Sequence, residues 1–359
     1  MNKRNYFNMQ DSGTIYLLFL IVMLLLSSIT SAICQNTGFS SNHEYYSIVM
    51  LAVNQIAMIL VIFGYTKFAK INFLEANNLK KAPTVKQSIT VVGIAISAML
   101  AFLPIAYLFV YLLELGGFRE TSAIVIPSGA GGVISGLIFA VILPAFLEEL
   151  LYRGAVLGGL KQKSYVSAVI LTSLIFSLAH GNATQTVHQF LASTVFCLIV
   201  LYGGSVWYGI IAHLTNNLIS LIFNYIPLNL EGLGYYNILL GVMCFIVGVS
   251  LLAILMRTFK QQCKDRQRDM DVIDVYPNGK FRYIISSIIE TITKFFRCIA
   301  NKEDRKACFS NFERETGELD NEYYEQRSVF GKVEGTSMIV IAVVVVLFVM
   351  WLVSLIRGF

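Results

Sequence analysis

Residues 141–160 read VILPAFLEELLYRGAVLGGL, and place two adjacent glutamates and an arginine inside an otherwise apolar run. An ionisable side chain at membrane depth costs about 2.5 kcal/mol or more, so residues of this kind indicate function. Glu149 and Arg153 lie four positions apart and can pair on one face of a helix, whereas Glu148 has no such partner in its own helix. The stretch therefore predicts a buried polar site on a membrane-embedded helix.

The whole chain has the composition of a membrane protein. Of its 359 residues, 56% are hydrophobic and 14% are charged, against about 25% charged in a soluble domain. The net charge of +5 is small and dispersed, which argues against nucleic-acid binding. Nine apolar runs approach or exceed the roughly 20 residues that span a bilayer, namely 14–34, 45–66, 88–113, 124–147, 165–181, 187–203, 205–224, 235–256 and 337–356. We expect an all-α polytopic transmembrane helical bundle, with an eight-helix core and one C-terminal transmembrane helix.

The Lys and Arg residues indicate the orientation of the bundle, because positive residues favour cytoplasmic loops. If the N-terminus is inside, the outer loops carry Arg119 alone until Arg357 near the end of the chain. The inner segments then hold most of the positive residues of the bundle, including Lys3, Arg4, Lys67, Lys70, Lys80, Lys81, Lys86, Arg153, Lys161 and Lys163. We expect an integral membrane protein with a cytoplasmic N-terminus.

Charge is concentrated in one stretch of the chain. From Arg257 to Gly335 there are 15 Lys and Arg residues and 14 Asp and Glu residues. Residues 257–336 are therefore expected to form a cytoplasmic region between the bundle (1–256) and the last helix (337–359). Apolar residues at helical spacing predict an amphipathic helix at about 281–300, which could lie in the membrane interface or cover the cytoplasmic mouth of the bundle. Its position suggests a role in gating or in substrate recruitment.

Two further apolar runs carry polar side chains. His180 ends the fifth run in LIFSLAHGN, and His213 and Asn217 lie four positions apart in the seventh, in GIIAHLTNNLIS. A rise of about 1.5 Å per residue puts Glu148, His180 and His213 at similar depths. Three helices distant in sequence therefore present polar groups at one level. The six cysteines form no C-x-x-C pair and are expected to be free thiols.

These residues resemble a family signature. Glu148-Glu149-Leu-Leu-Tyr-Arg153, Phe176-Ser-Leu-Ala-His180 and His213-Leu-Thr-Asn-Asn217 are similar, in this order, to the EExxxR, FxxxH and HxxxN motifs of the CPBP intramembrane proteases. That family includes CAAX prenyl endopeptidases and bacteriocin-processing or immunity-type (Abi) proteins. The resemblance covers about residues 85–256. It implies an enzyme of the bacterial plasma membrane that hydrolyses peptide bonds within the bilayer.

The resemblance also implies roles for individual residues. Glu148 would activate a water molecule, and His180 would help to hold and polarise it. His213 and Asn217 would stabilise the oxyanion, or would join Glu148 and His180 as ligands of a divalent metal such as zinc. The expected partners are the lipid bilayer and a peptide or membrane-protein substrate.

Structural and functional alternatives accompany this interpretation. Glu149 and Arg153, the supporting pair, could be an ion pair near a helix end, His180 could be an interfacial histidine, and His188 is expected to be mainly structural. Buried carboxylates and histidines would also suit a proton-coupled membrane transporter. A catalytically silent bacteriocin-immunity or scaffold protein of the same fold is a further alternative. No HExxH motif or GxSxG-type serine elbow supports another protease class.

Overall fold

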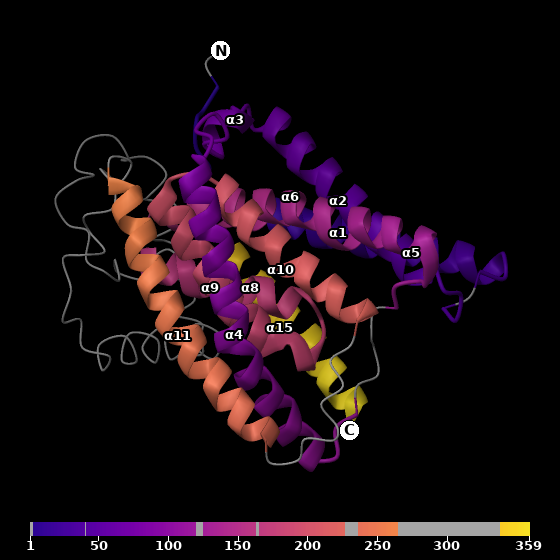
Figure 1. The fold of residues 1–359 in the computed structure, drawn as a ribbon. Helices are drawn as coiled ribbons and strands as arrows, with labels where there is room; N and C mark the ends of the chain where they lie inside the picture. The colour runs from indigo at the N-terminus through magenta and orange to yellow at the C-terminus, as the bar shows by residue number, and fades with distance from the viewer. Residues whose placement is uncertain (1–2, 40, 120–124, 163–164, 227–235, 265–337) are drawn as a thin grey trace, which may run out of the picture.

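The computed structural model describes residues 3–39, 41–119, 125–162, 165–226, 236–264 and 338–359 (Figure 1). Over these residues the backbone is helical apart from turns, short connections and one isolated bridge between Arg4 and Ile71. The predicted all-α class is confirmed. The predicted amphipathic helix at about 281–300, and nearly all of the charged region around it, lie outside the described residues.

The described helices follow the order of the predicted spans. They are α1 (Met9–Asn36), α2 (Tyr46–Phe68), the short α3 (Phe73–Ala76), α4 (Val85–Leu115), a composite helix from Gly129 to Leu160, α8 (Tyr165–Ala179), the 3-10 turn η3 (Ala183–Gln185), α9 (Thr186–Gly203), α10 (Trp207–Tyr225), α11 (Tyr236–Gln262) and α15 (Met338–Gly358). The predicted eighth span ends near residue 256, whereas α11 continues to Gln262. The first residues of the predicted charged region therefore belong to this helix.

Seven helices in the described ranges are long and apolar enough to cross a membrane, against nine predicted spans. α8 has only 15 residues. α10 has 19 residues but is not among the seven, and its middle contains His213, Asn216 and Asn217. Both helices pack against several other helices, which is how a short or polar helix is tolerated at membrane depth. The two exceptions carry the histidine motifs: His213 lies within α10, and His180 directly follows the last residue of α8.

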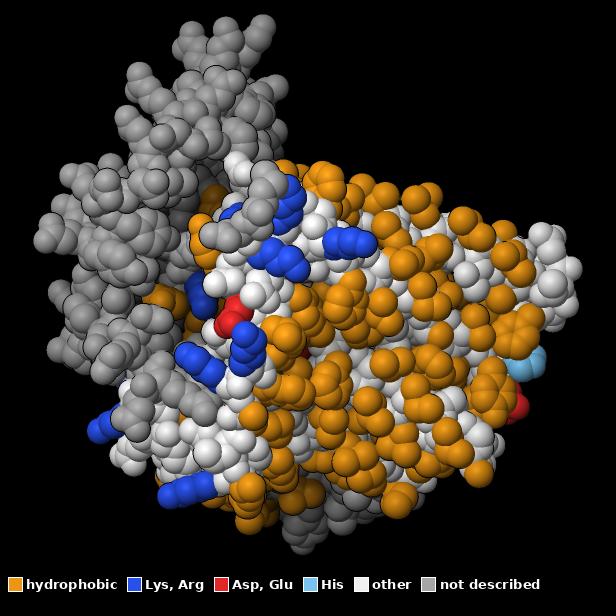
Figure 2. Space-filling model, turned by 90° about the horizontal axis from the view of Figure 1, so that it is seen from above, with side chains coloured by type: hydrophobic (Ala, Val, Ile, Leu, Met, Phe, Trp, Pro, Cys, Tyr) orange, Lys and Arg blue, Asp and Glu red, His pale blue; other side chains and the backbone are white. Residues whose placement is uncertain are grey.

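Lys and Arg side chains are concentrated at the end of the bundle that carries α3 (Figure 1 and Figure 2). The Arg4 N–H donates to the Lys70 carbonyl at 3.0 Å, which joins the N-terminal segment to the α2–α3 connection. The Trp207 indole at the start of α10 donates to the Leu79 carbonyl at 2.8 Å, in the connection between α3 and α4. Figure 2 views the molecule from the end that carries α3 in Figure 1, and shows Lys and Arg side chains gathered over one part of it, with hydrophobic side chains over much of the rest.

The composite helix that carries the glutamate pair is not uniformly α-helical. It consists of α5 (Gly129–Gly136), the π-helical η1 (Leu137–Ile142), α6 (Leu143–Glu149), the π-helical η2 (Leu150–Val156) and α7 (Leu157–Leu160). π-Helical turns are rare and are frequent at functional sites. α6, which ends with both glutamates, lies between two of them.

Pro144 explains the first π segment. Proline has no N–H, and its ring clashes with the carbonyl four residues earlier in a regular α-helix. The Leu143 N–H bonds instead to the Ile138 carbonyl, five residues back. In this five-residue pattern the Phe139 carbonyl would accept a hydrogen bond from the backbone N–H of residue 144. Pro144 has no N–H and cannot donate it. The buried Gln55 side chain of α2 donates to it at 2.8 Å, and so fills the gap that the proline leaves.

The main buried core includes helices from both ends of the chain. It contains side chains of α1, α2, η2, α8 and α9, and α15 adds Val340, Val343 and Leu347 to it. On another side α4 and α11 run side by side (Figure 1). A Cβ atom on Gly248 of α11 would collide with the Ala101 backbone of α4, so glycine permits this close approach.

Candidate active site

The imidazole of His213 on α10 contacts both adjacent glutamates of α6. Its Nδ1 lies 2.8 Å from Oε1 of Glu149, and its Nε2 lies 3.9 Å from Oε2 of Glu148. The side chains of Glu149, His213 and Glu148 are 0%, 5% and 15% exposed, respectively. The cluster is therefore buried, and Glu148 is its most accessible member.

A glycine on α10 allows this contact. Gly209 lies one turn before His213 and faces the Glu149 carboxylate. A Cβ atom at this position would collide with Oε2 of Glu149 and would press on the Val200 side chain. The absence of a side chain therefore lets α10 approach α6 closely enough for the imidazole to reach both carboxylates.

Glu149 is also held by a buried network. Nη1 of Arg153 donates to Oε1 of Glu149 at 2.7 Å, and Nη2 donates to Oγ of Ser193 at 2.9 Å. The guanidinium carbon lies 4.5 Å from the ring centre of Phe176 and 5.4 Å from that of Phe196. A buried ion pair is tolerated when further hydrogen bonds satisfy it, and the aromatic faces add cation–π attraction. The structure contains the expected Glu149–Arg153 pair, and gives its carboxylate a second partner in His213.

His180 is oriented by the last turn of its own helix. Its Nδ1 lies 2.8 Å from the Phe176 carbonyl oxygen, and its ring packs 4.8 Å from the Phe176 ring. A carbonyl oxygen only accepts hydrogen bonds, so Nδ1 carries a proton and Nε2 of the neutral ring keeps its lone pair. Glu148 and His213 lie close enough to His180 to interact with it electrostatically. The structure thus brings Glu148, His180 and His213 together.

Asn217 hydrogen-bonds to the neighbouring asparagine of α10. It is half-buried, and its Oδ1 receives a hydrogen bond from Nδ2 of Asn216 at 3.4 Å. Asn216 is buried and interacts with His188 of α9, which in turn interacts electrostatically with His180. Sequence reasoning missed Asn216 and left His188 as mainly structural. The available signal was that Asn216 lies three positions from His213, on the same side of α10.

The donor set does not fit a metal site. Among the described residues, no group of three or more His, Cys, Asp or Glu side chains is arranged to hold a metal ion. Nδ1 of His213 is engaged by Glu149 and Nδ1 of His180 by a backbone carbonyl, which leaves Nε2 as the ring nitrogen that either histidine could offer to a metal. A catalytic zinc ion takes three protein ligands and a water molecule, and the described side chains form no such group of three. The mechanism below therefore uses protein side chains and water alone.

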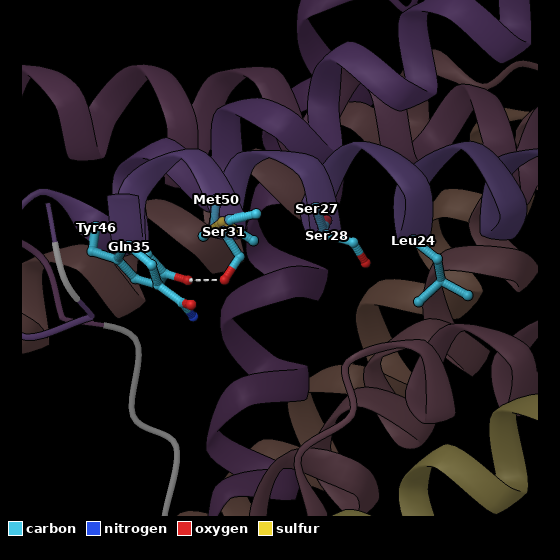
Figure 3. Close-up of a pocket in the computed structure, with 8 residues that line it drawn as sticks. Leu24, Ser27, Ser28, Ser31, Gln35, Tyr46 and Met50 are labelled. Atoms are coloured by element: carbon cyan, nitrogen blue, oxygen red, sulfur yellow. Dashed lines mark hydrogen bonds between the residues drawn. The ribbon is translucent and has the colours of Figure 1, made fainter. Parts of the chain in front are cut away.

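Two hollows lie elsewhere in the described structure. A groove of about 430 Å³ between α1 and α2 is lined by Leu24, Ser27, Ser28, Ser31, Ala32, Gln35, Tyr46 and Met50 (Figure 3). None of the predicted site residues lines it. A cavity of about 100 Å³ lies between the α3–α4 connection, α7 and the α9–α10 turn, and Arg153 is among the residues that line it. This smaller cavity adjoins the polar cluster from the positively charged end of the bundle.

Comparison with known proteins gives a family match over the helices that carry the three motifs. Residues 130–219 match a family model described as Rce1-like, type II CAAX prenyl endopeptidase. This range contains all three motifs, from the glutamate pair to Asn217, and ends within α10. Neither curated proteins nor solved structures gave a match to the chain. The family match confirms the resemblance predicted from the motifs.

Proposed function

We propose that this chain, a CPBP-type intramembrane peptidase with Rce1-like features over residues 130–219, hydrolyses its substrate with a water molecule activated by Glu148. The observation that carries the proposal is the double contact of His213, with Glu149 at Nδ1 and Glu148 at Nε2. One carboxylate is thereby engaged in holding the imidazole, while the neighbouring one stays available as a base.

The reaction follows from these positions. Glu148 takes a proton from a water molecule that Nε2 of His180 holds, and the water oxygen attacks the peptide carbonyl carbon. The resulting oxyanion is stabilised by an N–H at Nε2 of His213, whose Nδ1 faces the Glu149 carboxylate. Glu148 then returns its proton to the leaving amine nitrogen, the C–N bond breaks, and a carboxylic acid and an amine result.

Glu149 has a holding role in this mechanism. Its Oε1 accepts hydrogen bonds from both Arg153 and His213, and its side chain has no exposed surface. A carboxylate in this position fixes the ring orientation and favours the proton on Nδ1. Asn217, which the resemblance assigns to the oxyanion, is proposed to contact the substrate rather than the other site residues.

The proposed substrate is a peptide held at the membrane. The family description names CAAX prenyl endopeptidases, so a prenylated CAAX peptide is the first substrate class to test. α1, α2, α4 and α11 expose many large apolar side chains, as expected of helices in contact with lipid. We propose a plasma-membrane location with the N-terminus in the cytoplasm, on the basis of the positive residues at one end of the bundle.

The test is cleavage of a quenched fluorescent prenylated CAAX peptide by purified protein in lipid vesicles. Glu148→Gln keeps the shape of the side chain but removes the base, so the rate should fall by about two orders of magnitude or more. Glu114→Gln, which alters an exposed glutamate near the end of α4, is the control and should cleave as the wild type does. Equal rates for the wild type and Glu148→Gln would favour the transporter or scaffold alternatives.

A further inference from the structure

The last helix, α15, lies outside the range matched by the family model, yet it is built into the bundle. Val340, Val343 and Leu347 are buried in the main core. At the other end of α15, the Arg119 N–H donates to the Gly358 carbonyl at 2.7 Å, so the helix also docks on the segment that follows α4. α15 also packs against α8 and η3, the elements on either side of His180.

A hydrogen bond joins α15 to the turn between α8 and α9. Nε1 of Trp351 donates to Oγ1 of Thr186 at 2.7 Å. The same hydroxyl donates to the Asn182 carbonyl at 3.1 Å, and Oγ of Ser177 donates to the Thr186 carbonyl at 2.7 Å. Thr186 therefore connects α15, the end of α8 and the turn itself.

This turn carries His180 at its start. Gly181 has a φ of +61°, a left-handed conformation that glycine adopts without strain. The Asn182 side chain accepts a hydrogen bond from the Thr184 N–H at 2.9 Å, which makes residues 180–186 a compact turn. Because the turn is short and internally bonded, a displacement of Thr186 moves the backbone that supports His180.

We propose that α15 is part of the catalytic apparatus, and that Trp351 and Thr186 are positioning residues for His180. This inference rests on the proposed function, in which His180 holds the attacking water. Loss of the Trp351–Thr186 bond leaves the contacts of Glu148, Glu149 and His213 in place, but frees the turn that carries His180. The expected result is a lower kcat with a nearly unchanged KM.

The experiment is a double-mutant cycle on cleavage of the fluorescent prenylated CAAX peptide. Trp351→Phe removes the indole donor and keeps an aromatic ring, and Thr186→Val removes the hydroxyl at nearly constant volume. Trp351→Phe should lower kcat by about fivefold, the effect of one hydrogen bond, and Thr186→Val by at least as much, because it also removes the bond from the hydroxyl to the Asn182 carbonyl. The double variant should be no slower than Thr186→Val alone, because that single change already removes the Trp351–Thr186 bond. Thr186→Ser keeps the hydroxyl and should restore kcat to within about twofold of the wild type.

The other tryptophan provides a matched control. The chain has two tryptophans, and Trp207 also donates its indole N–H to an oxygen, that of Leu79 at the positively charged end of the bundle. Trp207→Phe should lower the Tm by an amount similar to Trp351→Phe while leaving kcat within about twofold of the wild type. The proposal would be overturned if the loss of kcat in the double variant equalled the product of the losses in Trp351→Phe and Thr186→Val. It would also be overturned if Trp207→Phe lost as much kcat as Trp351→Phe.

A second measurement does not depend on cleavage. Hydrogen exchange of the peptide that covers residues 177–188 should be about fivefold faster in Trp351→Phe than in the wild type, and unchanged in Trp207→Phe. Equal exchange in Trp351→Phe and the wild type would overturn the positioning role. If the wild type does not cleave the peptide but exchange is faster in Trp351→Phe, the proposed function is contradicted. The role of the Trp351–Thr186 bond in holding the turn is then still supported.

Discussion

Oε1 of Glu149 accepts a hydrogen bond from Nδ1 of His213 at 2.8 Å, so the second glutamate of the motif fixes the imidazole that faces the first. The same oxygen receives the Arg153 guanidinium at 2.7 Å. The two neighbouring carboxylates are therefore expected to differ in what their loss does to the protein.

Glu149→Met should destabilise the fold and abolish cleavage. It leaves the Arg153 guanidinium buried without its partner, which costs about 3 to 5 kcal/mol. The midpoint of thermal unfolding in detergent measures the effect. Combining it with Arg153→Met removes the unpaired charge and should recover most of the lost Tm without restoring cleavage, because His213 still lacks its acceptor. A double variant as unstable as the single one would contradict this account.

Gly209→Ala tests the close approach of α10 to α6. The added methyl group collides with the Glu149 carboxylate, so the variant should lose about 1 to 3 kcal/mol of stability and most of its activity. Gly64→Ala is the matched control, since a Cβ at Gly64 in α2 has no neighbour within 4 Å. It should leave cleavage unchanged and, by helix propensity, raise stability by about 1 kcal/mol or less. Similar behaviour of the two alanine variants would argue against the proposed contact.

Gln55→Leu tests whether the Gln55 side chain replaces the backbone N–H that Pro144 lacks. It leaves the Phe139 carbonyl without its donor, which should lower stability by about 1 to 3 kcal/mol. Pro144→Ala in the same protein supplies a backbone N–H at residue 144 and should return part of the lost Tm. If Pro144→Ala destabilises Gln55→Leu as much as it destabilises the wild type, the two residues are not coupled in this way.

Removal of divalent metals should leave cleavage unchanged. The described side chains form no group of three or more His, Cys, Asp or Glu residues arranged for a metal, and Glu148 with His180 suffices to activate water. The rate of peptide cleavage is measured after dialysis against EDTA and against 1,10-phenanthroline, with a zinc protease treated in parallel. Loss of activity that added zinc restores would require a metal-bound water instead.

The sequence predicted those parts of the site that depend on spacing within one helix. Glu149 and Arg153 pair because side chains four residues apart in a helix are neighbours. The contact between His213 and Glu149 depends on how closely α10 approaches α6, which Gly209 decides and which no periodicity reveals. The interaction of His188 with Asn216 likewise depends on the packing of α9 against α10.

In the fold, too, features set within one helix could be predicted, whereas features set by packing between helices could not. The order of the helices follows from their apolar runs, because a backbone within a membrane must satisfy its hydrogen bonds internally. Hydropathy gave no sign of the π segments, since it contains no information on hydrogen-bond pattern, and only Pro144 pointed to η1. α8 and α10 match the predicted positions, but their length and polarity depend on the helices that shield them.

The two π segments around α6 make the composite helix unusually tolerant of length changes. Deleting one residue from a regular α-helix rotates everything beyond it by about 100° and would turn a motif away from its partners. A π turn already contains one residue more than an α turn, so a deletion within η1 or η2 can be absorbed as a return to α-helical bonding. A single-residue deletion at either place is therefore expected to leave the direction of the glutamates nearly unchanged, whereas the same deletion within α6 would turn part of the motif by about 100°. The helix could therefore change in length over evolution, or in an engineered variant, while Glu149 keeps its contacts with Arg153 and His213.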